Sequence, residues 1–374
     1  MKTTVFAACI SDLTTEYRLY RQARSLVRQG CDVRVVSYAD PEKVPALGHW
    51  AGLSISLIRL SRSRLPGVLF FALYMIRLFF MALHARPAFY LACDLPALFP
   101  CVCASLLRGG SVVYDSRELY TELPDVHRSP FKKAVWRLLE GFSVRHVVRS
   151  ITVCESDRSD LARKYNCLAP VVVRNLPLYK PYAPNNALRE QCGVSGDMPI
   201  IVFQGSLLRS GGVHELVCAM DAVSRAHLVI IGDGPEAPRV RKALRDNNRA
   251  QRVSWLPPVP FTELHGLLCS ADVGVFTGAA DGASFANALP NKIFDYAMAG
   301  LPMAVSRLPE IEKVNGRYRF GVYIEAPHPD AIARALNDLL VSSAHLAEYR
   351  THALAMARDM RWENEEERFL ELFL

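Results

Sequence analysis

The chain has 374 residues, 51 % of them hydrophobic and 22 % charged, which excludes a disordered protein and leaves room for two globular domains. The formal charge of +7 and the isoelectric point of about 8.9 suit anionic partners such as phosphates, nucleotides or a membrane surface. Dense Lys/Arg runs and zinc-finger spacings are missing from the sequence, so nucleic acid is not an expected partner.

Strand and helix patterns alternate along the first half of the chain. Short β-branched runs predict strands at 3–10, 31–38, 54–61, 88–93, 111–116, 150–155 and 170–175. Helical patterns lie between them at 17–30, 64–87, 96–110, 131–146 and 156–165. Such alternation is typical of parallel strands joined by crossover helices.

The alternation stops at Leu176–Asn186, a proline-rich stretch without periodicity that we expect to link two domains. It restarts with strand patterns at 199–206, 226–235, 252–257, 272–278, 301–306 and 321–326. The fold class is therefore predicted as α/β, with two doubly wound parallel-sheet domains that face a cleft. We place the first domain at 1–178 and the second at 179–355, and expect a C-terminal helix at 356–374 to cross back to the first.

The segment Arg64–Pro87 is apolar and about long enough to span a bilayer. Three interpretations are open. A transmembrane helix would place Arg77 in the hydrocarbon, which is costly. A helix buried in a domain and a helix sunk in the membrane interface both avoid that cost. In the interfacial case Arg62, Arg64 and Arg86 would face anionic lipid.

The ten cysteines are scattered without any C-x-x-C pair, which favours reduced, buried thiols. Reduced thiols are typical of the cytosol. The first residues predict a strand and not a secretory signal. We therefore expect a cytoplasmic protein, either free or peripheral on the inner face of the plasma membrane.

Ligands of open α/β sheets bind at the carboxyl ends of the strands. In the second domain the loop Gln204–Gly212 is rich in glycine and leads into a helix with free amides. It is a candidate phosphate cradle to which Arg209 adds charge, and the alternative is a glycine-rich turn with a surface arginine. Asp233 and Gly234 follow the next strand and suit a turn.

A second candidate site is the stretch Asn287–Ser306. A helix is expected to begin at Asn291 and to end at Gly300. Lys292 would add positive charge to the amides of the helix start, and Asp295 lies one turn on, on the same face. The pair suits a diphosphate beside a ribose, whose diol a carboxylate can bind. The alternative is a salt bridge on a solvated face.

In the first domain Asp115, Arg117, Glu118 and Glu122 gather after a strand, either as part of a site or as a polar loop. Asp94 follows another strand and is expected to cap the next helix. Metalloprotease, nucleophile-elbow, P-loop and dinucleotide-binding motifs are missing from the sequence, and no D-x-D follows a predicted strand. A reaction without metal or cofactor is expected.

These stretches resemble glycosyltransferase family 4, a group of retaining, nucleotide-sugar-dependent enzymes with the GT-B fold. The resemblance covers nearly the whole chain, and its most specific parts are 114–122, 203–220, 229–236, 253–276 and 289–306. It implies transfer of a hexose from a UDP- or GDP-sugar to a glycan or lipid-linked acceptor. It also implies a role in bacterial cell-envelope polysaccharide synthesis, such as that of lipopolysaccharide.

The resemblance also implies site residues. Ser206 and Gly211 replace the arginine and lysine that the family usually has, so Arg209 and Lys292 are the expected catalytic pair on the leaving diphosphate. Asn287 replaces the family's sugar-binding acid. The expected donor contacts are Gly205, Ser206, Gly211, Asp233, Gly234, Val259, Asn287, Ala288, Leu289, Asn291 and Asp295. The expected acceptor contacts are Asp94, Arg117 and Glu118.

Other functions are open. The replacements at Ser206, Gly211 and Asn287 suit a catalytically inactive binding or scaffold protein of a polysaccharide assembly system. A nucleotide-sugar epimerase could share the fold, but the matching loops are those of transferases. A solute-binding protein also has two α/β domains, but the predicted first strand and scattered cysteines argue against it.

Overall fold

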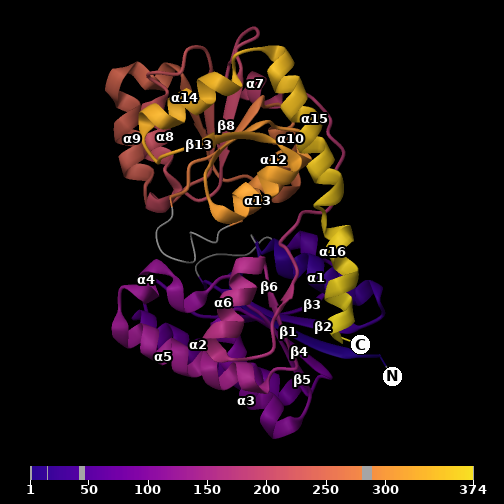
Figure 1. Ribbon diagram of the computed structural model, residues 1–374. Coiled ribbons are helices and arrows are strands. Elements are labelled where there is room, and N and C mark those ends of the chain that lie inside the picture. The colour runs from indigo at the N-terminus through magenta and orange to yellow at the C-terminus, as the bar shows by residue number, and fades with distance from the viewer. Residues whose placement is uncertain (1, 15, 42–46, 280–288, 374) are drawn as a thin grey trace. The chain divides into compact units, whose positions relative to one another are not determined.

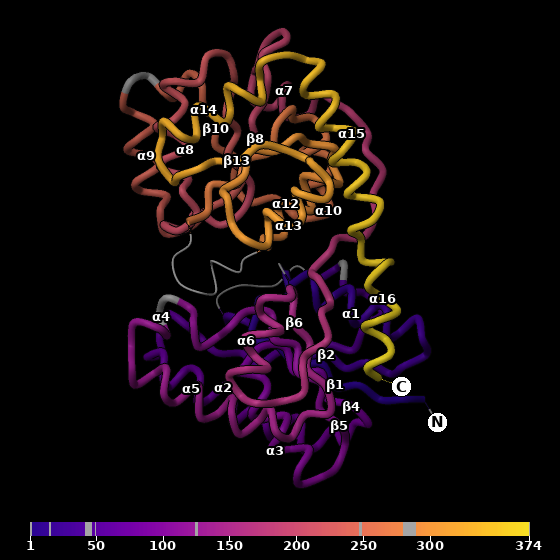
Figure 2. Tube along the Cα trace, in the orientation of Figure 1, coloured from indigo at the N-terminus to yellow at the C-terminus, as the bar shows by residue number. Residues whose placement is uncertain are grey.

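The structure is a computed structural model that describes residues 2–14, 16–41, 47–279 and 289–373. The chain forms two compact units (Figures 1 and 2). Unit 1 comprises Met1–Asn175 and Glu365–Leu374, and unit 2 comprises Leu176–Asn364. Each unit has a hydrophobic core of its own around a parallel sheet.

Unit 1 is built on a parallel sheet whose described strands follow the order β3-β2-β1-β4-β5-β6-β7. Residues of the central strands, among them Phe6 and Leu91, are almost completely buried because helices cover both faces. The strands are β1 (Thr4–Asp12), β2 (Asp32–Ala39), β3 (Ser54–Arg59), β4 (Phe89–Cys93), β5 (Ser111–Asp115), β6 (Arg149–Thr152) and β7 (Val171–Val172).

The helices of unit 1 connect these strands as crossovers. Glu16 caps the first helix by accepting a hydrogen bond from the Leu19 amide at 3.1 Å. The α-helices are α1 (Tyr17–Arg28), α2 (Gly67–Ala85), α3 (Leu95–Arg108), α4 (Pro124–His127), α5 (Pro130–Ser143) and α6 (Glu155–Tyr165). Short 3-10 turns are η1 (Gly48–Trp50), η2 (Tyr120–Glu122) and η3 (Val144–His146).

Helix α2 covers most of the apolar segment that the sequence left open. Among the described residues, it alone is long and apolar enough to cross a membrane, with 19 residues and a mean hydropathy of 2.0. It is also the crossover between β3 and β4 of the sheet. Its inner face is buried, and the Tyr74 hydroxyl donates a hydrogen bond to the Cys9 carbonyl at 2.7 Å. Only 22 % of its apolar window is buried, so of the two interpretations that do not span a bilayer, a helix held by one face fits better than a helix buried in the domain.

Unit 2 is built on a second parallel sheet, with its described strands in the order β10-β9-β8-β11-β12-β13. The strands are β8 (Ile200–Gln204), β9 (His227–Ile231), β10 (Val253–Leu256), β11 (Val273–Phe276), β12 (Met303–Ser306) and β13 (Gly321–Ile324). In both sheets the strand order reverses beside the first strand of the unit, as in doubly wound folds. The predicted fold class is confirmed for both units.

Helices cover both faces of the second sheet, where they bury two hydrophobic clusters. The α-helices are α7 (Ala187–Gln191), α8 (Val213–Ala219), α9 (Ala237–Arg245), α10 (Phe261–Leu268), α12 (Asn291–Met298), α13 (Pro309–Tyr318), α14 (Pro329–Leu339) and α15 (Ser343–Asp359). The 3-10 turns are η4 (Arg209–Gly211) and η5 (Asp246–Gln251). Helix α12 begins at Asn291 as predicted, and Gly300 after it has the expected positive φ of 64°.

The end of the chain belongs to unit 1. Helix α16 (Trp362–Leu370) begins in unit 2, and its residues from Glu365 onward, with η6 (Glu371–Phe373), belong to unit 1. The Glu365 carboxylate pairs with Arg174 at 3.1 Å. The Phe373 ring lies 5.5 Å from that of Phe89 on β4. Unit 1 is therefore made from the two ends of the chain.

Candidate functional site

In unit 2 the loops after β8 and β9 are packed backbone against backbone. The Gly205 amide donates to the Ile231 carbonyl at 2.9 Å, and the Leu207 amide donates to the Asp233 carbonyl at 3.0 Å. A Cβ at Gly234 would come within 2.6 Å of the Leu207 carbonyl oxygen, so the loops can approach only with glycine there. A turn follows β9 as predicted, but it lies at Pro235 and Glu236 and is closed by the Ala237 amide, which donates to the Gly234 carbonyl at 3.0 Å.

Lys292, in the first turn of α12, points its amine toward the loop after β8. The Nζ atom lies 4.1 Å from the centre of the Phe203 ring and 5.6 Å from that of Phe276. A Cβ at Gly205 would lie 3.4 Å from the same Nζ. Burial lowers the pKa of Lys292 to about 8, although Asp295 opposes the change. The solvated salt bridge that the sequence left open is therefore wrong.

Asp295 lies one turn after Lys292 and is held by the end of β8. The Gln204 side-chain amide donates to Asp295 Oδ2 at 3.3 Å, and the Gln204 backbone amide donates to the Tyr296 hydroxyl at 3.0 Å. The residue before α12 is Pro290, whose side chain cannot cap the helix. A carboxylate, an amine and the start of a helix thus meet at one corner of the sheet.

The loop Gly205–Gly212 borders the site formed by Lys292, Asp295 and the start of α12. A Cβ at Gly212, whose φ is 64°, would overlap the Thr277 carbonyl, and the Thr277 hydroxyl donates to the Gly211 carbonyl at 2.7 Å. Gly211 itself has room, because the nearest atom to a Cβ there would be the Ser206 carbonyl oxygen at 3.9 Å. Ser206 and Arg209 are exposed on the same loop.

The other predicted donor contacts are spread around this corner. Asp233 and Asn291 are exposed, and Asp233 accepts a hydrogen bond from the amide of Gly234 at 2.8 Å. The side chains of Val259 and Leu289 are partly buried against the core of unit 2, so only their backbone and outer edges can face a ligand. Asn287 and Ala288 lie outside the described residues.

In unit 1 a buried ion pair lies at the carboxyl end of β5. Asp115 accepts two hydrogen bonds from the Arg18 guanidinium, from Nε at 2.8 Å and from Nη2 at 2.7 Å, and one from Gln22 at 2.9 Å. Burial opposes ionisation of Asp115, but Arg18 outweighs it and holds the pKa of this carboxyl below its ordinary value. Asp115 is therefore charged and fixes α1 against the sheet.

Arg117 lies two residues farther on, among several acids. Its Nη1 atom is 2.6 Å from Glu16 Oε2 and 3.9 Å from Asp94 Oδ2, and its Nε atom is 3.7 Å from Asp115 Oδ2. Nη2 is buried and makes no hydrogen bond with the described residues. Glu118 is exposed beside them. The structure thus brings together the three predicted acceptor contacts.

The predicted capping role of Asp94 is wrong. Asp94 occupies the N-cap position of α3, but its side chain makes no capping hydrogen bond and turns toward Arg117. Its φ is 65°, which is unfavourable for an aspartate, whereas its backbone amide is held by the Asp115 carbonyl at 3.0 Å. Burial raises the pKa of Asp94 to about 7 despite Arg117. This carboxyl therefore titrates near neutral pH.

Some residues of these sites were not predicted. Glu16, Arg18 and Gln22 lie on or before α1, and their partners, Arg117 for Glu16 and Asp115 for the other two, are more than ninety positions away. The available signal was that Arg18 and Gln22 share a helix face with the apolar Leu19 and Ala23, which an amphipathic surface helix would not do.

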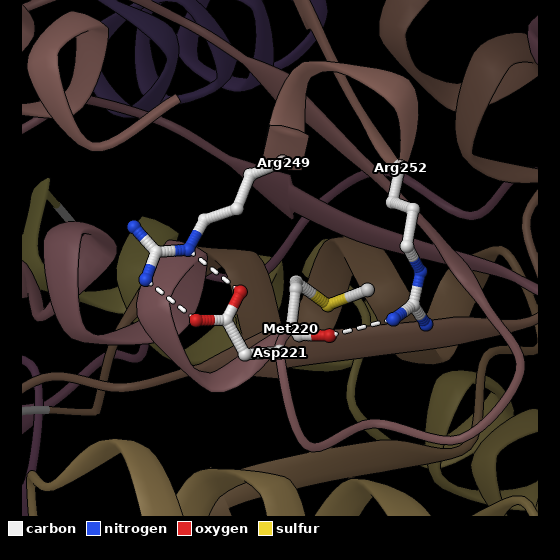
Figure 3. A pocket seen from close by; sticks show the side chains of 4 residues that line it. All are labelled: Met220, Asp221, Arg249 and Arg252. Atoms are coloured by element: carbon white, nitrogen blue, oxygen red, sulfur yellow. Dashed lines mark hydrogen bonds and ion pairs between the residues drawn. The ribbon is translucent and has the colours of Figure 1, made fainter. Parts of the chain in front are cut away.

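A separate hollow of about 300 Å³ lies elsewhere in unit 2 (Figure 3). Arg249 makes a two-point ion pair with Asp221 there, and Arg252 donates to the Met220 carbonyl. Arg252 also binds two further carbonyls just before β9. It precedes β10, so the hollow lies at the amino ends of the strands, opposite the candidate site. These interactions tie loops together and leave little for a ligand.

Within the described ranges, no group of three or more His, Cys, Asp or Glu side chains is placed to hold a metal ion. None of the ten cysteines, all of which lie in the described ranges, forms a disulfide; five are buried and five partly buried.

The fold and the site define a protein with two Rossmann-like units and polar groups at the carboxyl ends of the strands. Residues 198–342 match the family model of group 1 glycosyl transferases, and residues 14–177 match that of the glycosyl transferase 4-like domain. No curated protein matches the chain in sequence. The chain belongs to the family 4 type of glycosyltransferases with the GT-B fold.

Solved structures share this fold at low sequence identity. Sucrose-phosphate synthase from Thermosynechococcus elongatus superposes with a TM-score of 0.81 at 15 % identity, over 100 % of this chain and 98 % of that one. HepE from Anabaena with UDP-glucose gives 0.78 at 16 % identity, over 98 % of each chain. A mutant of TarM from S. aureus with Fondaparinux, α-GlcNAc-glycerol and UDP gives 0.72 at 10 % identity, over 99 % of each chain.

Proposed function

We propose that the chain is a retaining glycosyltransferase that uses a UDP- or GDP-sugar and needs no metal ion. The acceptor is a glycan or a lipid-linked glycan of the bacterial cell envelope. The observation that carries the donor assignment is Lys292, whose amine lies over Phe203 beside Gly205, one turn before Asp295. HepE with UDP-glucose and TarM with UDP favour uridine as the base.

The proposed chemistry uses groups at the start of α12. The Lys292 ammonium and the positive end of the α12 dipole stabilise the charge that develops on the diphosphate as it leaves, and Arg209 adds to them. Asp295, oriented by Gln204, accepts hydrogen bonds from the ribose. The bond from the anomeric carbon to the phosphate oxygen breaks, and a bond to the acceptor oxygen forms on the same face. The acceptor proton goes to the leaving phosphate.

Unit 1 supplies the acceptor contacts in this proposal. The Asp94 carboxyl and Nη2 of Arg117 can bind hydroxyl groups, and Glu118 is exposed next to them. The pair Arg18–Asp115 and the contact of Arg117 with Glu16 hold these groups in place. Rigid support of this kind favours a sugar-binding surface over a mobile polar loop.

Ligand-induced stabilisation tests the donor site. The melting temperature is measured with UDP, GDP, ADP, CMP and their sugars, in the presence of a chelator. A ligand that binds only the folded chain at a hundred times its Kd adds about 2.7 kcal/mol of stability. We expect a shift with one diphosphate that Asp295→Ala abolishes and that the control Asp338→Ala, at an exposed position of α14, retains. No shift with any nucleotide would refute the proposal.

A second candidate function is a non-catalytic binding protein of a polysaccharide assembly system. It is favoured by Ser206 and Gly211, which leave the loop after β8 with fewer charges than family members usually have. Nucleotide binding does not separate the two functions. Release of UDP or GDP from the matching sugar nucleotide does, because a binding protein would bind the donor without turning it over.

A further inference from the structure

The outer surfaces of three helices of unit 1 carry large apolar side chains that are exposed. Phe131 on α5 is 75 % exposed, Leu138 on α5 74 % and Val68 on α2 73 %. Large apolar side chains on a soluble surface are usually scattered singly. Here they gather on α2, α3 and α5, and their members are Val68, Leu69, Ile76, Phe80, Leu106, Leu107, Phe131, Val135, Leu138 and Phe142. We call this set the three-helix face.

On α5 the exposed residues form one stripe. They follow the spacing i, i+4, i+7 and i+11 and therefore lie on one side of the helix: Phe131, Val135, Leu138 and Phe142. The opposite side is buried and consists of Trp136, Glu140 and Ser143. Helix α5 thus has an apolar side chain, Trp136, on its buried side and an apolar stripe on its exposed side.

Helix α2 likewise has a buried side and an exposed side that is apolar. Its buried side consists of Phe70, Tyr74, Leu78 and Ala82. The opposite side carries the exposed Leu69, Ile76 and Phe80, again at helical spacing. A soluble helix normally places polar residues on this outer side.

The outer sides of the three helices face the same way. All three bury their inner sides in one core cluster on the same sheet, so their outer sides point away from that sheet. They also touch one another, since the rings of Phe71 and Trp136 lie 5.4 Å apart and those of Phe99 and Phe142 6.0 Å apart. In Figures 1 and 2 the helices lie together along the lower side of unit 1.

The exposed charged residues within these three helices are all basic. Glu140 is the single acid within α2, α3 and α5, and it is buried, where it accepts hydrogen bonds from Tyr114 and Tyr165. Exposed basic residues lie on or beside the three helices: Arg64, Arg77, Arg86, Arg108, Lys132 and Arg137. On α5, Lys132 and Arg137 flank the apolar stripe on its two sides.

We propose that the three-helix face docks on the surface of an anionic phospholipid bilayer. An apolar stripe flanked by lysine and arginine is the pattern of a helix that lies in the membrane interface. The segment 64–87 is then one part of a broader surface. Helix α5 contributes its two most exposed apolar side chains, Phe131 and Leu138. Dimerisation through this face fits the charge less well, because the basic residues of the two copies would lie against one another and repel.

Binding to vesicles tests the proposal with the full chain. Sedimentation is compared for vesicles of phosphatidylcholine alone and with phosphatidylglycerol added, at low and high salt. We expect binding only to the anionic vesicles, and weaker binding at high salt. The pair Phe131→Ser and Leu138→Ser, and separately the pair Lys132→Glu and Arg137→Glu, should each weaken binding by roughly tenfold or more.

The matched control changes two apolar residues of similar exposure that lie outside the face. Leu168 is 71 % exposed and Val341 75 %, and their serine variants should bind vesicles as the unchanged chain does. In a further variant, Phe131→Trp, tryptophan emission should shift to the blue with anionic vesicles, whereas Val341→Trp should not respond. Thermal unfolding verifies that each variant is folded.

Three results would overturn the proposal. The first is that the unchanged chain ignores anionic vesicles at low salt. The second is that either pair of variants on α5 binds as well as the control. The third is a dimer in solution that Phe131→Ser with Leu138→Ser dissociates. The docking proposal does not depend on the proposed reaction, because nucleotide-induced stabilisation of the same variants reports on the donor site separately.

Discussion

Arg18 and Asp115 are 97 positions apart in the chain and meet in a two-point ion pair that is almost completely buried. The pair joins α1 to the carboxyl end of β5, and the Nε atom of Arg117 lies 3.7 Å from Asp115 Oδ2. It thus supports the residues proposed to bind the acceptor.

Removing one member of this pair should cost more stability than removing both. Arg18→Met leaves the buried Asp115 without its main partner, which should lower the free energy of unfolding by about 3 to 5 kcal/mol. Arg18→Met combined with Asp115→Leu should recover part of that loss, since no buried charge is left unpaired. Urea unfolding of the single and double variants measures both effects. Equal losses in all variants would contradict this prediction.

Diphosphate binding should depend on pH through Lys292. Its pKa of about 8 is lower than usual, so the amine loses its charge as the pH rises through that value. A bound diphosphate favours the charged form, so the affinity for UDP should fall above pH 8, by up to about tenfold per pH unit. Lys292→Met should bind UDP more weakly at neutral pH and show no such fall. Calorimetry over a pH series measures both, and uridine, which lacks phosphates, should show no dependence in either protein.

Gly211→Lys should increase donor binding and turnover. The position has room for a side chain, and the new amine would stand where family members usually carry one. One more charge near an exposed diphosphate is worth about 1 kcal/mol, or roughly fivefold in Kd. The control is Gly316→Lys, which adds the same charge to α13 at a position that is also open. Donor release assays compare them; an equal gain in both would point to net charge alone.

Asp94 should make the folded chain less stable above neutral pH. Its pKa is raised to about 7 in the folded state, so the folded chain binds this proton more tightly than the unfolded chain. The resulting stabilisation is complete at low pH and is lost as the pH rises through about 7. In Asp94→Asn, which has the same shape and bears the same backbone strain, this loss should vanish, a difference of on the order of 1 to 3 kcal/mol between pH 5 and pH 8. Urea unfolding at both pH values measures it, with Asp338→Asn as the control.

Much of the fold could be predicted because each element leaves a local pattern. The β-branched runs gave the parallel strands, and Gly300 marked the end of α12. Lys292 and Asp295 could be assigned to one helix face for the same reason. The aromatic rings around Lys292 could not be predicted. Phe203 and Phe276 lie at the ends of two different strands, and the order of the strands in the sheet decides which side chains meet there.

Side-chain partners far apart in sequence were beyond prediction. Arg18 was expected on an ordinary helix, and only packing turns it toward the sheet. Asp94 was expected to cap α3, but the positive φ directs its carboxyl to Arg117 instead. Polar residues at strand ends could be selected as candidates, while their burial and pKa values required the packed structure.

The return of the chain to unit 1 has a consequence for its synthesis. A ribosome makes the strands of unit 1 before unit 2, but Glu365, Phe369 and Phe373, which complete unit 1, follow the whole of unit 2 in the chain. Unit 1 therefore stays incomplete during synthesis of unit 2, because Phe89 lacks its contact with the Phe373 ring until then. A chain that stopped within unit 2 would therefore leave unit 1, although made earlier, without the residues that complete it.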